Sequence, residues 1–269
     1  MKTKITSLAL VLTSALTGAQ AGEISHSDGG IANTQDKAVQ EQTQDKDGWD
    51  FRIGLPIWIS GTKGTVGVRK REVHVDDSFS DVLDTLDFTA ALNLEIRKGR
   101  FLFFSDGLYL KTSTDGAPRG LFSGGNVAYD QKLAFDDLAI GYAVVKNDCF
   151  SLEAFAGAQL VYLEPKLTLS LPIADRTAST SKFWADPIVG VYLNYRFHKV
   201  LGFYTKADVG GFDVSSRLTW QVEGGLDWAI ARNFYARLAY RYLNTDYEKG
   251  QLSYNVSIHG PQLELGLRF

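Results

Sequence analysis

The sequence has few of the residues that cross-link a chain or interrupt its secondary structure. It contains one cysteine, Cys149, and 6 prolines among 269 residues. A single cysteine excludes an intramolecular disulfide. Beyond the N-terminal segment there is also no run of about 18 apolar residues, so no transmembrane helix is predicted.

Basic residues are too few for a nucleic-acid-binding surface. The chain has 28 Lys and Arg against 31 Asp and Glu. Loss of a signal peptide carrying Lys2 and Lys4 would leave 26 against 31, a net charge near −5. Nucleic-acid-binding proteins normally present a basic face, so no nucleic-acid partner is expected.

The N-terminus has the three parts of a secretory signal peptide. A short basic segment is followed by the mostly apolar residues Ile5 to Leu16 and by the cleavage site Ala19-Gln20-Ala21. Residues 1–21 are therefore predicted to be a signal peptide. Residues 22–48 are polar and rich in Gln, Asp and Ser, which predicts a flexible periplasmic leader.

Strict alternation of apolar and polar residues begins at Trp49 and continues to the last residue. It is clearest at the C-terminus, where Leu263, Leu265, Leu267 and Phe269 alternate with Gln262, Glu264, Gly266 and Arg268. A period of two places the apolar set on one face of a strand. In a membrane barrel, every second residue faces lipid. Residues 49–269 are therefore predicted to form an all-β, membrane-spanning, antiparallel up-and-down barrel.

Ten strands fit the pattern best, although eight or twelve stay open. Four short turns join them at one end, whereas the connections Gly61–Asp87, Ser113–Asn126 and Glu164–Phe183 are long. Outer-membrane barrels have short periplasmic turns and long extracellular loops, so both termini are predicted in the periplasm. The ten segments are residues 49–60, 88–97, 101–112, 127–145, 150–163, 184–197, 201–209, 218–230, 234–242 and 252–269.

Several strands interrupt the alternation. Pro56 cannot donate a hydrogen bond to a neighbouring strand, which predicts a bulge there. The apolar phase changes at Asp136-Asp137, as it would at a β-bulge. It changes again around His259-Gly260-Pro261. The facing of residues 101–112 is ambiguous, so we place Asp106 inside and expect a local irregularity.

The predicted inward positions are strongly charged, with acids and bases nearly balanced. Opposite charges at this density are expected to pair into a network that fills a narrow lumen. A selective pore would show rings of one sign; a small water-filled channel stays as the alternative. The acids are Asp50, Glu95, Glu153, Asp186, Asp208, Glu223, Asp227 and Glu264, and the bases are Arg52, Arg97, Arg196, Lys206, Arg237, Arg241 and Arg268.

Aromatic residues fall near the strand ends, as the belts at the two membrane interfaces require. The periplasmic belt is predicted to contain Trp49, Tyr195, Phe197, Trp228, Phe234 and Phe269, and the outer belt Tyr109, Tyr162, Trp220 and Tyr242.

Residues with catalytic or metal-binding potential are sparse. His74-Val75-Asp76-Asp77 holds one imidazole and two carboxylates, but a metal site needs three or four converging ligands. A solvated acidic loop is the better reading. The following segment, Ser78 to Leu86, combines a capping box with apolar residues at helical spacing. It predicts a short amphipathic helix at the barrel mouth, with partner docking as an alternative.

His259 is the other candidate, with Ser253, Ser257 and Glu264 near it in sequence. Spacing alone assembles no set of nucleophile, base and orienting group, so a histidine in the barrel wall is favoured. Cys149 is expected to be a buried or rim thiol at a strand start. No catalytic, cofactor-binding or metal-binding residue is therefore predicted, and no cofactor.

Five stretches resemble a poorly characterised group of outer-membrane barrels of Gram-negative bacteria, broadly the small OmpA- and OmpW-type barrels. The resemblance implies an outer-membrane location and recognition of the terminal Phe269 by the barrel assembly machinery, but it carries over no catalytic residue. The stretches are Val75–Asp87, Arg97–Lys111, Trp184–Gly190, Ala207–Phe212 and His259–Phe269.

The predicted function is non-enzymatic. The chain is expected to serve as a structural element, a surface anchor or a narrow pore, with membrane lipid as its partner. A surface hydrolase acting on lipid or peptide and a channel for small solutes are the alternatives. The sequence leaves the oligomeric state open.

Overall fold

The computed structural model describes residues 48–68, 71–77, 80, 86–116, 126–171, 174–250 and 252–269. The predicted signal peptide and almost all of the leader lie outside these residues, as does most of the predicted amphipathic helix. Leu86, the last apolar residue of that helix, begins a strand instead. No helix in the described part of the chain is long and apolar enough to cross a membrane.

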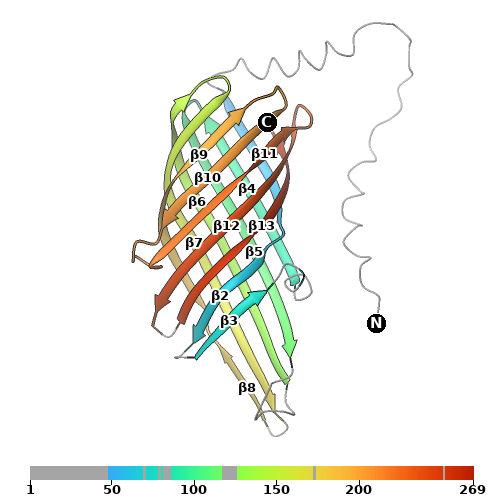
Figure 1. Ribbon diagram of the computed structural model, residues 1–269, viewed down its shortest axis with the longest axis vertical. Helices are drawn as coiled ribbons and strands as arrows, with labels where there is room; N and C mark the ends of the chain where they lie inside the picture. Colours follow the sequence, from blue (N-terminus) through green and yellow to red (C-terminus); the bar gives the residue numbers. More distant parts are fainter. Residues whose placement is uncertain are drawn as a thin grey trace, which may run out of the picture. The chain divides into compact units, whose positions relative to one another are not determined.

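The described residues form one antiparallel sheet of thirteen strands. Ten of them (β1, β4 to β7 and β9 to β13) close into a barrel through pairing of β1 with β13 (Figure 1). The predicted ten-stranded barrel is confirmed. The strands are β1 (Trp49–Trp58), β2 (Gly61–Val68), β3 (Arg71–Asp77), β4 (Leu86–Lys98), β5 (Phe101–Gly116), β6 (Asn126–Lys146), β7 (Phe150–Leu171), β8 (Ala174–Ser179), β9 (Lys182–Arg196), β10 (Leu201–Gly210), β11 (Leu218–Ala229), β12 (Phe234–Lys249) and β13 (Leu252–Arg268).

The first and last barrel strands meet near the C-terminus. Phe51 and Phe269 exchange backbone hydrogen bonds of 3.1 and 2.9 Å. Closure pairs backbone groups that an open sheet would leave exposed to hydrocarbon. Gly266 belongs to this seam and faces inward, because the ring of Tyr235 lies over it. A Cβ at position 266 would lie 2.4 Å from Tyr235 Cζ.

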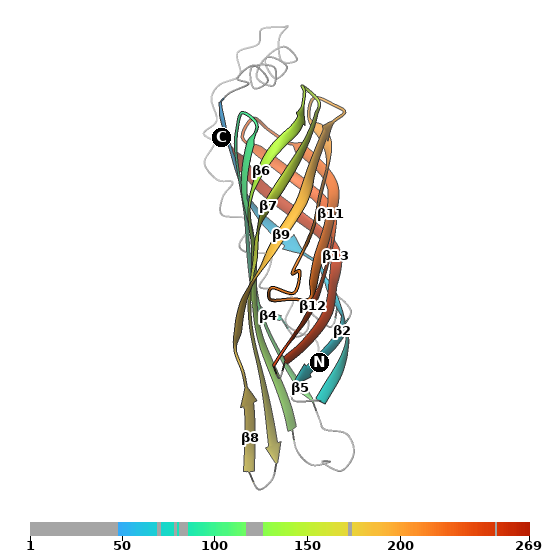
Figure 2. The ribbon, with the colours of Figure 1, turned by 90° about the vertical axis from the view of Figure 1, so that its left-hand side faces the viewer.

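Two of the predicted loops contain strands. β2 continues β1 along β13 without a change of register, because Trp58 pairs with Gln262 and Gly61 with His259. In the same way, β8 continues β9 along β7. The strands therefore extend the wall at the end opposite the C-terminus, which we call the loop end (Figures 1 and 2). The end with the four short turns is the turn end.

The predicted bulges are wrong. Pairing of β1 with β13 runs unbroken through Pro56, and both pairings of β6 run unbroken through Asp136-Asp137. The backbone groups of successive residues in a strand point alternately to its two neighbouring strands. Phe51 bonds to β13, so the backbone of Pro56, an odd number of positions away, faces β4, where its N–H is missing. Pairing with β4 already stops at Gly54, so no ladder bond is lost. Asp106 points inward as predicted, and the pairing around it is regular. The irregularity expected in residues 101–112 lies at the end of that segment, where the register shifts between Leu86 and Phe88, opposite Thr112 and Lys111.

The apparent phase changes are inversions of polarity. Towards the turn end of β13, Leu263 and Leu265 are exposed on the outer face. Towards the loop end, Ser257 and His259 take outer positions, while Val256 points inward and is buried. β6 inverts at Asp136-Asp137 in the same way, with Leu133 and Phe135 inside and Leu138, Ile140 and Tyr142 outside.

Strand length explains the inversion. β6 and β7 contain 21 and 22 residues, roughly twice the 9–11 that a tilted strand needs to cross a bilayer. The turn-end half has the apolar outer face that suits lipid. The loop-end half has a polar outer face and an apolar interior, which suits water. This division suits a barrel that projects beyond the bilayer at its loop end.

Arginine substitutions on the outer face of β13 test this division. Leu265→Arg is expected to destabilise the barrel by about 2–4 kcal/mol, the cost of a charge on the lipid face. Asn255→Arg, on the same face but in the loop-end half, is expected to change stability by less than about 1 kcal/mol. Urea unfolding in phospholipid vesicles measures both. Equal losses of stability for the two variants would contradict the idea that the loop end projects beyond the bilayer.

The six aromatic residues predicted for the periplasmic belt are all exposed at the turn end. Their position at a membrane interface stays a prediction. In the outer belt, Trp220 stacks on Tyr242 at a centroid distance of 4.9 Å. His259 extends this stack, 5.6 Å from Tyr242.

Candidate functional site: the filled lumen

Arg237, on β12, is the centre of the charge network in the turn-end half of the lumen. Its Nη1 lies 2.6 Å from Glu95 Oε1 and 3.8 Å from Glu264 Oε1, and its Nε lies 3.2 Å from Asp227 Oδ2. The guanidinium also lies 4.7 Å from the ring centroid of Tyr204. One buried cation thus joins three acidic side chains from three different strands.

The acids around Arg237 have further partners. The hydroxyl of Tyr192 donates to Glu95 Oε1 at 2.8 Å. The hydroxyl of Tyr235 donates to Glu264 Oε1 at 2.5 Å, and Asn93 Nδ2 donates to the other oxygen at 3.2 Å. Buried polar networks stabilise a structure only when their members are bonded in this way.

Three more arginines form ion pairs at the turn end. Arg268 bonds to Asp50 at 2.5 Å, and Arg52 to Asp227 at 2.8 Å. Arg97 bonds to Glu95 and lies 3.4 Å from Glu153. The predicted inward positions are confirmed, except that Arg196 is exposed where β9 ends.

Arg241 organises a second, middle layer closer to the loop end. Its Nη1 lies 3.2 Å from Asp106 Oδ2, and its Nη2 lies 2.7 Å from Gln221 Oε1 and 3.5 Å from Asp137 Oδ2. Lys206 pairs with Asp106 from the opposite side. Asp137 is completely buried. It was missed in the sequence because the expected bulge at this point obscured which way it faces.

The middle layer is not charge-balanced. It holds four acids and two bases, so the near-cancellation predicted for the whole lumen does not hold locally. Among the described residues, both carboxylate oxygens of Asp208 lack a hydrogen-bond partner. The buried acids are Asp106, Asp137, Asp208 and Glu223, and the bases are Lys206 and Arg241.

Uncharged polar side chains cover the middle layer. Gln159 Nε2 donates to Asp137 Oδ1 at 3.0 Å, and Thr219 Oγ1 donates to Gln159 Oε1 at the same distance. Thr245 lies beside them, with its hydroxyl 3.4 Å from that of Thr219. This layer separates the charged part of the lumen from the apolar part.

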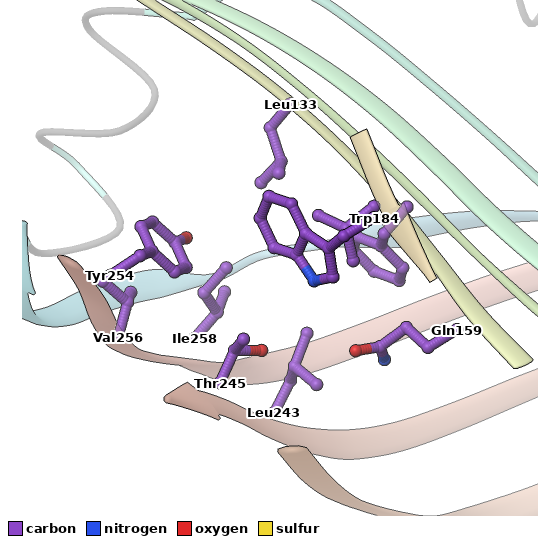
Figure 3. Close-up of a pocket in the computed structure, with 10 residues that line it drawn as sticks. Leu133, Gln159, Trp184, Leu243, Thr245, Tyr254, Val256 and Ile258 are labelled. Atoms are coloured by element: carbon purple, nitrogen blue, oxygen red, sulfur yellow. The ribbon is translucent and has the colours of Figure 1, made fainter. Parts of the chain in front are cut away.

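The loop-end interior is an apolar core between two walls of the barrel. Trp184 from β9 stacks on Tyr247 from β12, with ring centroids 4.4 Å apart. Figure 3 shows Trp184 and Leu133 facing side chains of β12 and β13, with Gln159 beside them. The buried members of the core are Leu133, Phe135, Val161, Leu163, Trp184, Leu243, Tyr247, Leu252, Tyr254, Val256 and Ile258.

Two small cavities lie among the side chains of the lumen. One cavity, lined by residues of the apolar core together with Gln159 and Thr245, has a volume of about 20 Å³. Another, between Glu95, Lys206 and Arg237, has about 10 Å³. A water molecule needs about 10–15 Å³ on this measure. Each cavity therefore has room for about one water molecule.

The proposed hydrolase residues are not brought together. His259 lies on the outer face, where its Nδ1 is 2.9 Å from the hydroxyl of Tyr240. Ser257, also outside, accepts a hydrogen bond of 3.0 Å from Tyr242. Glu264 is buried inside the lumen. The barrel wall thus separates the histidine from the carboxylate.

The remaining candidates form no site in the described part of the chain. His74 lies on β3 opposite Thr65, and Asp76 pairs with Lys63 at 3.3 Å. No group of three His, Cys, Asp or Glu side chains is arranged there to hold a metal. Cys149 is exposed in a turn, in agreement with the rim position expected for it.

Comparison with known proteins identifies the fold. No family model matches the sequence, and no characterised protein is significantly similar to it. Among solved structures, the outer membrane protease OmpT from Escherichia coli aligns with a TM-score of 0.53 and 11% identity, over 82% of this chain and 96% of OmpT. The chain has the fold of an outer-membrane β-barrel. At this identity the likeness shows the fold alone.

Two other solved structures align less well. Neisserial surface protein A gives a TM-score of 0.33 at 14% identity, over 82% of this chain and 98% of that protein. Ail of Yersinia pestis gives 0.31 at 14% identity, over 83% and 99%. The narrower resemblance to OmpA- and OmpW-type barrels stays a prediction.

Proposed function

We propose that this barrel is a closed, non-enzymatic anchor in the outer membrane, which holds its loop-end half at the cell surface. The observation that supports this best is that side chains fill the lumen, ionic ones in the turn-end and middle parts and apolar ones in the loop-end part. Ion pairs around Arg237 and Arg241 fill the turn-end and middle parts. The apolar core around Trp184 fills the loop-end part.

A small-solute channel is disfavoured by the same contacts. Conduction requires a continuous path whose binding sites release the solute again. Here a solute would have to displace paired, buried side chains and then cross an apolar core. The cavities between them have room for about one water molecule each.

The orientation follows from the two ends of the barrel. Short turns and both ends of the barrel segment lie together, and the long connections lie at the opposite end. Outer-membrane barrels place short turns in the periplasm and long loops outside. The projecting loop-end half is then at the cell surface, where a polar outer face is required.

A surface hydrolase is the second function class, and OmpT, which shares the fold, is a protease. The similarity of OmpT to this chain does not identify any catalytic residue in this chain. The placement of His259 outside and Glu264 inside the wall does not favour this function.

Planar-bilayer recording of the refolded barrel tests the closed lumen. We expect no stepwise conductance at neutral pH, because ion pairs and an apolar core fill the described part of the lumen. A general porin in the same bilayer serves as the positive control, and protease protection verifies insertion. Conductance steps that scale with salt concentration would show an open lumen and overturn the proposal.

A further inference from the structure

The turn end of the barrel carries an exposed ring of basic side chains. Each of the four short turns, with the strand ends beside it, contributes at least one of them. Because the turns are spaced around the barrel, the basic residues surround it. We call this set the basic collar: Lys98, Arg100, Lys146, Arg196, Lys199 and Arg232.

The collar has a large excess of positive charge. Against its six bases, the described turns hold one exposed acidic side chain, Asp148. The nearby acids Asp50 and Glu153 point into the lumen, where Arg268 and Arg97 pair with them. The excess therefore faces outward from the barrel.

Several described bases of the loop end lie beside acids. Lys132 pairs with Glu164 at 3.1 Å, and Lys166 with Asp130 at 3.7 Å. Lys63 pairs with Asp76, and Arg217 lies 3.6 Å from Asp246 and 3.5 Å from Glu248. These four bases thus lie beside five acids, whereas the six bases of the collar have one exposed acid among the described turn residues.

The collar lies beside the turn-end aromatic belt. Lys98 Nζ is 4.6 Å from the ring centroid of Trp49. Arg100 donates to the carbonyl oxygen of Ala143 at 3.1 Å, and Lys146 donates to that of Gly99. Aromatic belts mark the depth of lipid head groups. Basic side chains at the same depth meet the lipid phosphates.

We infer that the basic collar binds the phosphate groups of anionic phospholipids in the leaflet that contacts the turn end. A ring of lipids fits this surface because the charge surrounds the barrel, as a lipid shell does. Attraction between basic side chains and anionic lipids falls off within a Debye length. The inference requires the barrel to lie in a bilayer but does not depend on a closed lumen.

Quenching of tryptophan fluorescence by brominated lipids measures which lipid contacts the barrel. The barrel is refolded into phosphatidylcholine vesicles that contain either brominated phosphatidylglycerol or brominated phosphatidylcholine. Trp49 and Trp228 lie at the turn end and report on the collar. We expect phosphatidylglycerol to associate about fivefold more strongly, the ratio for one basic side chain meeting one lipid phosphate. High salt should remove the preference.

Two variants with the same change in net charge locate the effect. The turn-end variant carries Lys98→Gln, Arg100→Gln, Lys146→Gln, Lys199→Gln and Arg232→Gln. The loop-end control carries Lys63→Gln, Lys132→Gln, Lys166→Gln, Lys182→Gln and Arg217→Gln. The turn-end variant should lose the preference, and the control should keep it.

If the turn-end variant does not fold, the smaller change Lys199→Gln with Arg232→Gln replaces it and should reduce the preference. Equal association of both lipids with the wild-type barrel would overturn the inference. So would a preference that the turn-end substitutions leave intact. The bilayer recordings report separately on the lumen, so the two proposals fail independently.

Discussion

Replacing Arg237 with methionine is expected to lower the free energy of unfolding by about 3–5 kcal/mol, the usual cost of removing one member of a buried ionic network. The substitution leaves Glu95, Asp227 and Glu264 without their shared cation in the lumen. Methionine fills much of the same space, so the loss reports on charge more than on packing. Urea unfolding of the barrel in phospholipid vesicles, followed by tryptophan fluorescence, gives the difference.

Arg217→Met is the matched control. Arg217 also lies near two acids, Asp246 and Glu248, but its side chain is 60% exposed. Exposed pairs contribute less than about 1 kcal/mol, so a small change is expected. Similar losses for both arginines would mean that water reaches Arg237.

A double-mutant cycle isolates the contact with Glu95. Glu95→Gln removes the negative charge next to Arg237, and residues in contact couple by about 0.5–3 kcal/mol. The double variant Arg237→Met with Glu95→Gln is therefore expected to be more stable than the sum of the single losses predicts. Simple additivity would show that the two side chains do not interact.

Much of the barrel was predictable because a strand repeats every two residues. Once Leu263 and Leu265 are assigned to lipid, the same parity assigns Gln262 and Glu264 to the lumen. This parity rule correctly predicts most of the charged residues that face the lumen, including Arg237 and Arg241. Arg196 is the exception, because parity says nothing about where a strand leaves the barrel.

The inversion of polarity was not predictable from alternation alone. Alternation separates two faces of a strand but does not say which face meets solvent. At Asp136-Asp137 the sequence shows a change of phase, and a bulge and an exit from the bilayer produce the same pattern. The pairing partners decide between them, and those of β6 continue without a shift through Asp136-Asp137. The register of β6 with β7 shifts elsewhere, between Ala143 and Val145.

The extra strands β2 and β8 were missed for a different reason. β2 is rich in Gly and Thr and lacks a strong apolar face of its own. It is a strand because it continues β1 along β13, nearly 200 residues away in sequence. Local patterns hold no information about that partner.

Parity decides the hydrolase hypothesis once the pairing of β13 shows no bulge between the two residues. His259 and Glu264 are separated by five positions, an odd number, which places them on opposite faces of one strand. The structure has this arrangement. A catalytic pair on a barrel strand must be separated by an even number of positions or come from different strands.

Replacing Trp184 with alanine tests the apolar core of the loop-end half. Trp184 is 5% exposed, stacks on Tyr247, and donates from Nε1 to Asp186 at 3.1 Å. Truncation of a buried aromatic residue costs about 3–5 kcal/mol, because contacts are lost and a cavity remains. We expect a loss of this size in urea unfolding.

The neighbouring residue on the same strand supplies the control. Phe183 is 67% exposed on the outer face of β9, so Phe183→Ala is expected to change stability by no more than about 0.5 kcal/mol. The pair compares the two faces of one strand at one height. If lipid surrounded this part of β9 and water filled its interior, Phe183→Ala would be the more costly change. A larger loss for Trp184→Ala therefore means that the loop-end half is folded around an apolar interior, as a water-exposed extension must be.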